Sequence, residues 1–141
     1  TEILLMKSET AKKLISNIRF GQTRNAARKS KGQGLTVKDI DLTPDDLIRK
    51  FQDQDGKCHW SGIALDESYN YITRHPLAIS VDRLENNKGY TFDNVALTLR
   101  VFNLGKASYT GDFSEVVQTI KESWKWNEHK TKKTIITYSG L

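Results

Sequence analysis

The chain has 141 residues, of which 37% are hydrophobic and 28% charged, and its formal net charge is +5. These values fit one globular domain spanning residues 1–141 and exclude a disordered polyelectrolyte. No apolar run approaches the roughly 20 residues of a membrane helix, and residues 1–20 lack the order of a secretion signal, so we expect a cytoplasmic protein without a membrane partner.

Residues 9–38 form a basic lead-in, in which no acidic side chain occurs from residue 10 to residue 38. Apolar residues recur there at spacings of three and four, which predicts one long helix or two shorter helices meeting near Gly21. Such a block attracts a polyphosphate partner, although it is also typical of a solvated helix face. The cations that we expect to make such contacts are Arg19, Arg24, Arg28, Lys29 and Lys31.

Residues 43–65 predict a helix followed by a short hairpin. Thr43 is suited to cap the helix and Pro44 to be its first residue, because that position needs no backbone N–H partner. The segment KCHWSGIAL then resembles two short strands joined by a turn at Ser61 and Gly62.

The C-terminal half predicts a strand, a loop, a second strand and a helix within residues 77–107. LAISV and NVALTL are the strands, because they are rich in β-branched and apolar residues, and LENNKGYTFD supplies turn chemistry between them. From Leu99 the apolar spacing becomes helical, and this helix would carry Asn103 and Lys106. A last helix and a tail are expected within residues 113–141.

Asp82 and Asn103 have the chemistry of a metal site. Asp82 ends the first strand with a carboxylate, whereas Asn103 is an amide within an apolar helix, where burial is costly unless a partner binds it. Carboxylate and amide oxygens are hard ligands that suit Mg²⁺ or Mn²⁺. The sequence therefore predicts one such ion, with most of its coordination shell left for water and phosphate oxygens.

The segment ISVDRLENNKGYTFDNVALTLRVFNLGK resembles the HNH, or ββα-metal, endonucleases, especially the small phage HNH proteins and PacI-type restriction enzymes. In that family an acid or histidine pair ends the first strand, an asparagine precedes the second, and a histidine or asparagine on the helix completes the metal site. The matching positions are Asp82 with Arg83, Asn94 and Asn103. The resemblance, over about residues 15–115, implies an α+β fold with a ββα-metal (HNH, His-Me finger) core flanked by helices, in which Asn94 braces the loop.

The sequence departs from the family pattern in two features. The cysteine pairs that bind zinc in many relatives are absent, so we expect no structural zinc from the single Cys58. Arg83 stands where the general-base histidine is usual, and an arginine cannot accept a proton, so we expect it to clamp the scissile phosphate. The base is then expected to be His59, with His75 and Tyr90 as the alternatives.

These features lead us to expect a metal-dependent HNH endonuclease that hydrolyses DNA phosphodiester bonds and is of the restriction, homing or nicking type. The resemblance to small phage HNH proteins implies that a bacteriophage encodes it. Lys106 shares a helix face with Asn103 and is expected to contact a phosphate. A homodimer would place two sites on opposite strands. The alternatives are a non-catalytic DNA-binding module that keeps the fold, a structure-selective resolvase, and a structural protein of a phage particle.

Overall fold

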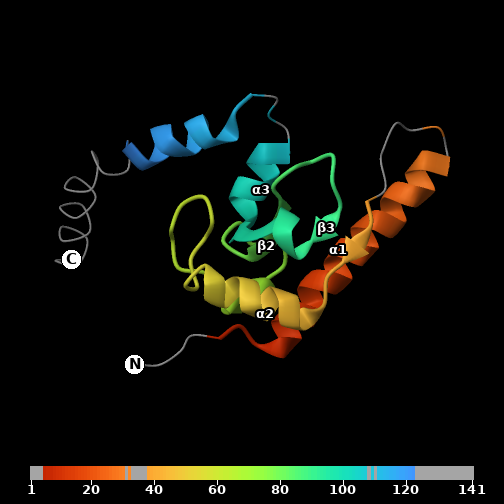
Figure 1. Ribbon diagram of the computed structural model, residues 1–141, viewed down its shortest axis with the longest axis horizontal. Helices are drawn as coiled ribbons and strands as arrows, with labels where there is room; N and C mark the ends of the chain where they lie inside the picture. Colours follow the sequence, from red (N-terminus) through yellow and green to blue (C-terminus); the bar gives the residue numbers. More distant parts are fainter. Residues whose placement is uncertain (1–4, 31, 33–37, 108, 110, 123–141) are drawn as a thin grey trace. The chain divides into compact units, whose positions relative to one another are not determined.

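The computed structural model describes residues 5–30, 32, 38–107, 109 and 111–122 (Figure 1). The chain divides into two compact units, residues 1–107 and residues 108–141. In the second unit residues 113–122 form a helix, as expected, whereas the predicted tail after it lies outside the described residues. None of the described helices is long and apolar enough to cross a membrane.

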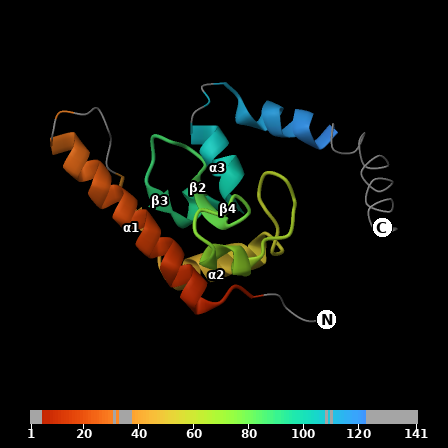
Figure 2. The ribbon, with the colours of Figure 1, turned by 180° about the vertical axis from the view of Figure 1, so that it is seen from behind.

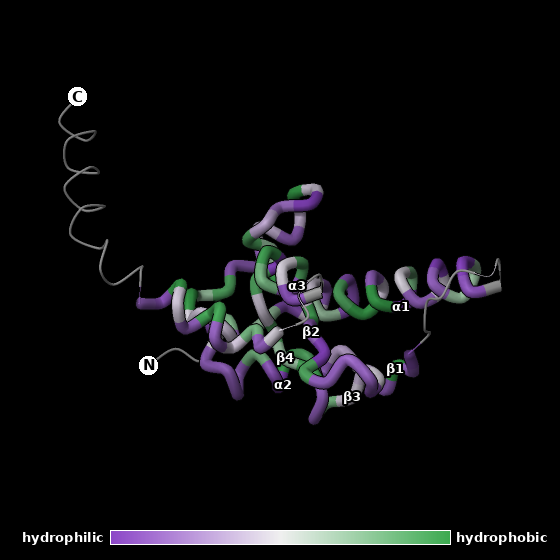
Figure 3. Tube along the Cα trace, turned by 90° about the horizontal axis from the view of Figure 1, so that it is seen from above, coloured by the Kyte–Doolittle hydropathy of each residue, from purple (hydrophilic) through white to green (hydrophobic). Residues whose placement is uncertain are grey.

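Helix α1 (Ser8–Ser30) is one continuous helix rather than two. Its buried side chains, which include Ala11, Leu14 and Ile15, lie in its first half, at spacings that place them on one face. The cations of its second half are exposed. Figure 3 shows this change of character, with hydrophobic colour near the strands and more hydrophilic colour toward the other end of the helix. The core therefore anchors the first half of α1 and leaves the basic half facing solvent.

Helix α2 (Pro44–Asp53) begins where its capping residues predict. The Thr43 hydroxyl accepts a hydrogen bond from the Asp46 backbone N–H at 3.2 Å, and the Asp46 carboxylate accepts one from the Thr43 N–H at 2.9 Å. Leu47 and Phe51, four residues apart, are buried in the core. The predicted start of this helix is confirmed.

The predicted hairpin is present as a small loop closed by a single bridge between Lys57 and Ala64. The chain turns at Gly62, whose φ of 73° lies in the left-handed region that favours glycine. Cys58, next to the bridge, is buried and donates its backbone N–H to the Ile63 carbonyl at 2.8 Å. This loop carries two of the residues considered below, His59 and Trp60.

Strand β4 (Val95–Leu99) holds the hairpin in place. The Gln54 side chain both donates to the Leu97 carbonyl and accepts from its N–H, each at 2.8 Å, and the His59 N–H donates to the same carbonyl at 3.0 Å. The Cys58 thiol lies 3.2 Å from the Thr98 hydroxyl and so adds a side-chain contact between the hairpin and β4.

The same thiol has a lowered pKa. Burial alone would raise the pKa of Cys58, but hydrogen bonds with Ser61 and Thr98 outweigh burial and lower the pKa.

The strands and the last helix of the first unit form a continuous strand-strand-helix arrangement (Figure 2). Strand β2 (Ile79–Arg83) pairs with β4 in antiparallel register, with Asp82 opposite Ala96, and α3 (Arg100–Ala107) follows β4 directly. All five β4 residues are buried. The α+β class is confirmed, and so is the order of elements expected for residues 77–107.

A second, very short sheet braces the loop between the two long strands. Strand β3 (Tyr90–Thr91) pairs in parallel with β1 (Ile40–Asp41), and the Tyr90 N–H donates to the Asp39 carbonyl at 2.8 Å. Gly89 precedes this contact, and a Cβ added there would lie 2.7 Å from the Asp39 carbonyl oxygen. Only glycine lets the two backbones approach this closely.

We therefore expect Gly89→Ala to lower the free energy of unfolding by about 1–3 kcal/mol, because a backbone atom must move to admit the methyl group. Chemical denaturation measures this change. The matched control is Gly21→Ala in α1, where an added Cβ meets nothing within 4 Å, and this variant should be more stable by about 1 kcal/mol. Equal effects of the two substitutions would contradict the close approach at Gly89.

Candidate functional site

Asp82 is a buried carboxylate whose two oxygens both have partners, and it is only 3% exposed. Oδ1 accepts a hydrogen bond from the Lys106 ammonium at 3.0 Å, and Oδ2 accepts one from the Trp60 indole N–H at 2.9 Å. Lys106 also donates to the Arg83 carbonyl. The negative charge of Asp82 is thus balanced by a cation from α3 and oriented by the hairpin.

Asn103 lies on α3 with its amide in a fixed orientation. Its Nδ2 donates to the Ser80 hydroxyl at 2.8 Å and to the Val81 carbonyl at 3.2 Å. Because these bonds use both amide hydrogens, the side-chain oxygen remains the acceptor. Asn103 therefore offers an oxygen ligand beside β2.

A small cavity of about 190 Å³ adjoins these side chains. It brings together four of the predicted site residues, namely Asp82, Arg83, Asn103 and Lys106, and the alternative base Tyr90. The complete lining consists of Val81, Asp82, Arg83, Asn86, Tyr90, Asn103 and Lys106. Residues from β2, the following loop, β3 and α3 thus converge on one space.

Arg83 is held against the loop that follows β2. Its Nη1 donates to the Asn86 carbonyl at 2.6 Å and to the Lys88 carbonyl at 3.1 Å, and the guanidinium lies 5.2 Å from the centre of the Tyr90 ring. These contacts leave the Nε and Nη2 hydrogens of Arg83 for a further acceptor. The arginine is suited to bind an anion, but it cannot take a proton.

Asn94 performs the bracing role that the sequence predicts. It is buried, and its oxygen accepts from the Glu85 N–H at 2.9 Å. Its Nδ2 donates to the carbonyls of Glu85, at 3.1 Å, and Gly89, at 2.9 Å. These three bonds close the loop between β2 and β3, so Asn94 shapes the site through the backbone.

The two histidines considered as bases do not line the small cavity, whereas Tyr90 does. His59 is exposed, and its ring lies edge-on to Trp60 with the centroids 4.9 Å apart. His75 stacks on Tyr69 at 4.3 Å, and its Nδ1 accepts from the Leu77 N–H at 3.0 Å. His59 and Trp60 lie in the turn of the hairpin, and the side chain that reaches Asp82 from this turn is that of Trp60.

The predicted DNA contacts have different positions in the structure. Four of the α1 cations are exposed, namely Arg19, Arg24, Arg28 and Lys29, whereas Lys31 lies outside the described residues. Lys106 is buried and forms an ion pair with Asp82. The sequence predicted neither this ion pair nor the hydrogen bond that the Trp60 indole donates to Asp82. The placement of Lys106 three residues after Asn103, on the same helix face, was the available signal.

The Asp82 carboxylate and the Asn103 amide supply oxygen atoms, which are the ligands that a divalent ion such as Mg²⁺ prefers. Within the part of the chain that the structure describes, no three His, Cys, Asp or Glu side chains gather in a group that could hold a metal. A magnesium site needs fewer protein ligands, because the ion retains water and binds phosphate oxygens. Asp82 and Asn103 border one cavity, and the Lys106 ammonium shows that a cation is stable beside Asp82.

Replacing Asn94 tests the bracing of the site. We expect Asn94→Asp to lower the free energy of unfolding by about 1–3 kcal/mol, because a carboxylate cannot donate to the carbonyls of Glu85 and Gly89. Denaturant titration at neutral pH measures the change. The control is Asn87→Asp at an exposed position of the same loop, which should change stability by less than about 0.5 kcal/mol. Similar losses in both variants would contradict the bracing role.

Comparisons of the chain with protein-family models, with curated proteins and with solved structures find no match.

Proposed function

We propose that this chain is a metal-dependent HNH endonuclease that hydrolyses DNA phosphodiester bonds, with β2, β4 and α3 as its ββα-metal core. The observation that carries the proposal is the single cavity bordered by Asp82, Arg83 and Asn103. The sequence separates these residues by up to 21 positions, yet all three border one space, and Asp82 and Asn103 match the metal-ligand positions of the HNH resemblance. The exposed cations of α1 add a surface suited to a polyanion.

In this proposal the oxygens of Asp82 and Asn103 would hold one Mg²⁺ or Mn²⁺. When bound, the ion supplies positive charge that stabilises the charge developing on the phosphate and the leaving oxygen. Trp60 keeps the Asp82 carboxylate in orientation through Oδ2, and the Ser80 hydroxyl does the same for Asn103. Both ligands are therefore fixed before substrate arrives, which lowers the cost of assembling the site.

Arg83 binds the scissile phosphate through its remaining N–H donors. Because its Nη1 is already fixed by two carbonyls, the guanidinium is oriented before the phosphate enters. A charged donor held in place stabilises the extra negative charge of the transition state more than that of the ground state. This is the role expected for an arginine at the position of the usual base.

The lining of the cavity favours Tyr90 as the group that accepts a proton from the attacking water. Tyr90 borders the same space as Asp82 and Arg83, whereas His59 and His75 do not border it. In its ionised form a phenol oxygen can act as the general base. His59, which the sequence ranks first, is the alternative that mutagenesis must test.

Cleavage of supercoiled plasmid in Mg²⁺ or Mn²⁺ tests the proposed function. We expect nicking or linearisation by the native chain, and at least about 100-fold slower cleavage for Asp82→Asn and for Asn103→Ala. Tyr90→Phe should lose about 10²–10⁴-fold, whereas His59→Gln should keep most activity.

Two outcomes would contradict these expectations. Absence of cleavage by the native chain, with DNA binding retained, would identify a DNA-binding module rather than a nuclease. Full activity of Tyr90→Phe together with loss in His59→Gln would assign the base to His59.

Lys106→Met tests the metal ligands without any measurement of activity. The variant leaves Asp82 buried without its cation, so we expect it to lose about 3–5 kcal/mol of stability in the absence of metal. If Asp82 and Asn103 bind Mn²⁺, the ion should raise the Tm of Lys106→Met more than that of the native chain, because the ammonium no longer competes for Oδ1.

Two controls accompany this experiment. Adding Asp82→Asn to Lys106→Met should abolish the effect of Mn²⁺ on Tm. Lys88→Met breaks an exposed pair with Glu85 and should cost less than about 1 kcal/mol. Equal shifts of Tm in the native chain, Lys106→Met and the double variant would exclude a metal site at Asp82.

A further inference from the structure

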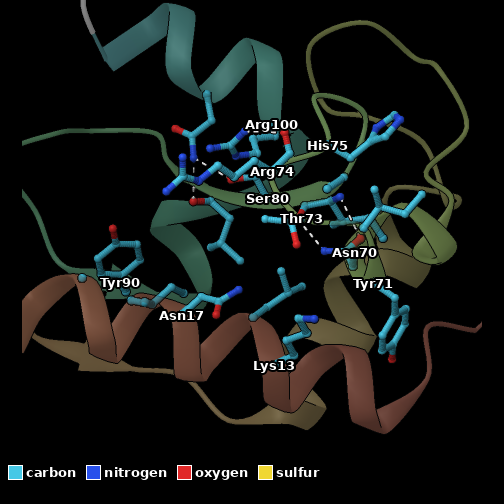
Figure 4. A pocket seen from close by; sticks show the side chains of 18 of the residues that line it. Lys13, Asn17, Asn70, Tyr71, Thr73, Arg74, His75, Ser80, Tyr90 and Arg100 are labelled. Atoms are coloured by element: carbon cyan, nitrogen blue, oxygen red, sulfur yellow. Dashed lines mark hydrogen bonds between the residues drawn. The ribbon is translucent and has the colours of Figure 1, made fainter.

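A larger groove of about 540 Å³ runs between α1 and the segment of residues 70–75, and also borders β2 and α3. It shares Val81, Tyr90 and Asn103 with the lining of the small cavity. In Figure 4, Lys13 and Asn17 on α1 lie on one side, and Arg74, His75 and Arg100 lie on the other. Its volume is that of a ligand pocket, so it can enclose part of a substrate that reaches the site.

The groove is lined by cations without acids. Lys13, Arg24, Arg74 and Arg100 all border it, and no Asp or Glu of the described residues does. Like charges gathered in one concave space repel one another, and a bound anion removes this repulsion. The charge therefore favours an anionic ligand, and the anion that a nuclease would meet is a DNA phosphate.

The wall opposite α1 is pre-organised. Arg74 has a φ of 56°, in the left-handed region that is costly for a residue with a side chain, and the Arg100 Nη1 donates to its carbonyl at 2.8 Å. The Asn70 side chain donates to the Ile79 carbonyl and accepts from the Ile79 N–H, both at 2.9 Å. These contacts fix the segment to β2 and α3, so Arg74 is presented to the groove at no further cost in backbone entropy.

The neutral lining suits a nucleotide base. The amide side chains of Asn17 and Asn25 border the groove and can pair with base edges. Tyr71 also borders it, with 54% of its surface exposed, and its hydroxyl lies 3.3 Å from that of Thr10. Lys13 lies 4.9 Å from the centre of the Tyr71 ring. An aromatic ring beside a cation is the usual platform for an unstacked base and its phosphate.

We propose that this groove binds an unpaired nucleotide next to the phosphate that is cut, so that the substrate is DNA with a single-stranded or unstacked base there. This inference rests on the proposed nuclease function. The bases of an intact duplex are stacked inside the helix and cannot enter a concave groove without unpairing. A strand with a gap presents both its base and its phosphate to the lining.

Fluorescence anisotropy with the full chain, in EDTA, tests the proposal with two labelled probes: a blunt DNA duplex and the same duplex with a short single-stranded gap. We expect the gapped probe to bind about tenfold more tightly than the duplex. Lys13→Ala and Arg74→Gly should remove most of this preference and leave duplex binding nearly unchanged. Glycine tolerates the left-handed φ of Arg74, so folding is preserved.

Lys12→Ala is the matched control, since Lys12 is the exposed neighbour of Lys13 on α1 but does not line the groove. It should keep the preference for gapped DNA. Equal affinity for both probes, or equal losses in Lys12→Ala and Lys13→Ala, would overturn the proposal.

Cleavage of the same two probes in Mn²⁺ separates this inference from the proposed function. Faster cutting of the gapped probe supports both. Cutting of both probes at one rate would overturn the groove proposal and leave the nuclease intact. Preferential binding of gapped DNA without any cleavage would support the groove and overturn the nuclease.

Discussion

Two opposite charges meet beneath α3, where the Lys106 ammonium donates to the Asp82 carboxylate at 3.0 Å and both side chains are almost fully removed from water. Removing two ions from water is costly, and their attraction offsets this cost only while the remaining polar atoms also have partners. Trp60 supplies that partner for Asp82, and the Arg83 carbonyl supplies it for Lys106. The pair thereby fixes α3, which also carries Asn103, over the end of β2.

The rest of the first unit supports this pair in two directions. On one side, β4 holds the hairpin through Gln54 and the backbone of His59, and so delivers the Trp60 indole to Asp82. On the other side, Asn94 closes the loop after β2, and the close approach at Gly89 joins that loop to β1. The hairpin thus supports Asp82 directly through Trp60, whereas Asn94 and Gly89 support the loop that follows the strand carrying Asp82.

The cavity of the proposed nuclease site and the groove of the proposed nucleotide site have lining residues in common. Tyr90 and Asn103 border both the small cavity and the groove along α1, so a phosphate at the first and a nucleotide in the second would belong to one strand. Charge is distributed to match: among the described residues, the lysine and arginine side chains that border the groove have no acid beside them in its lining, whereas the acid Asp82 borders the small cavity. A divalent ion is attracted by an acid, and a DNA backbone by cations.

The sequence by itself determined the local elements. The Thr43 cap predicts the start of α2, the β-branched runs predict β2 and β4, and the change to helical spacing predicts α3, because each signal depends on neighbours in the chain. The sequence also predicted that Asp82 and Asn103 lie close together, and both residues border the small cavity. Only the tertiary structure decided that Lys106 pairs with Asp82, that Trp60 rather than His59 faces it, and that Tyr90 borders the cavity. Periodicity tells which face of an element a side chain occupies, but the partner on the facing element depends on how distant segments pack.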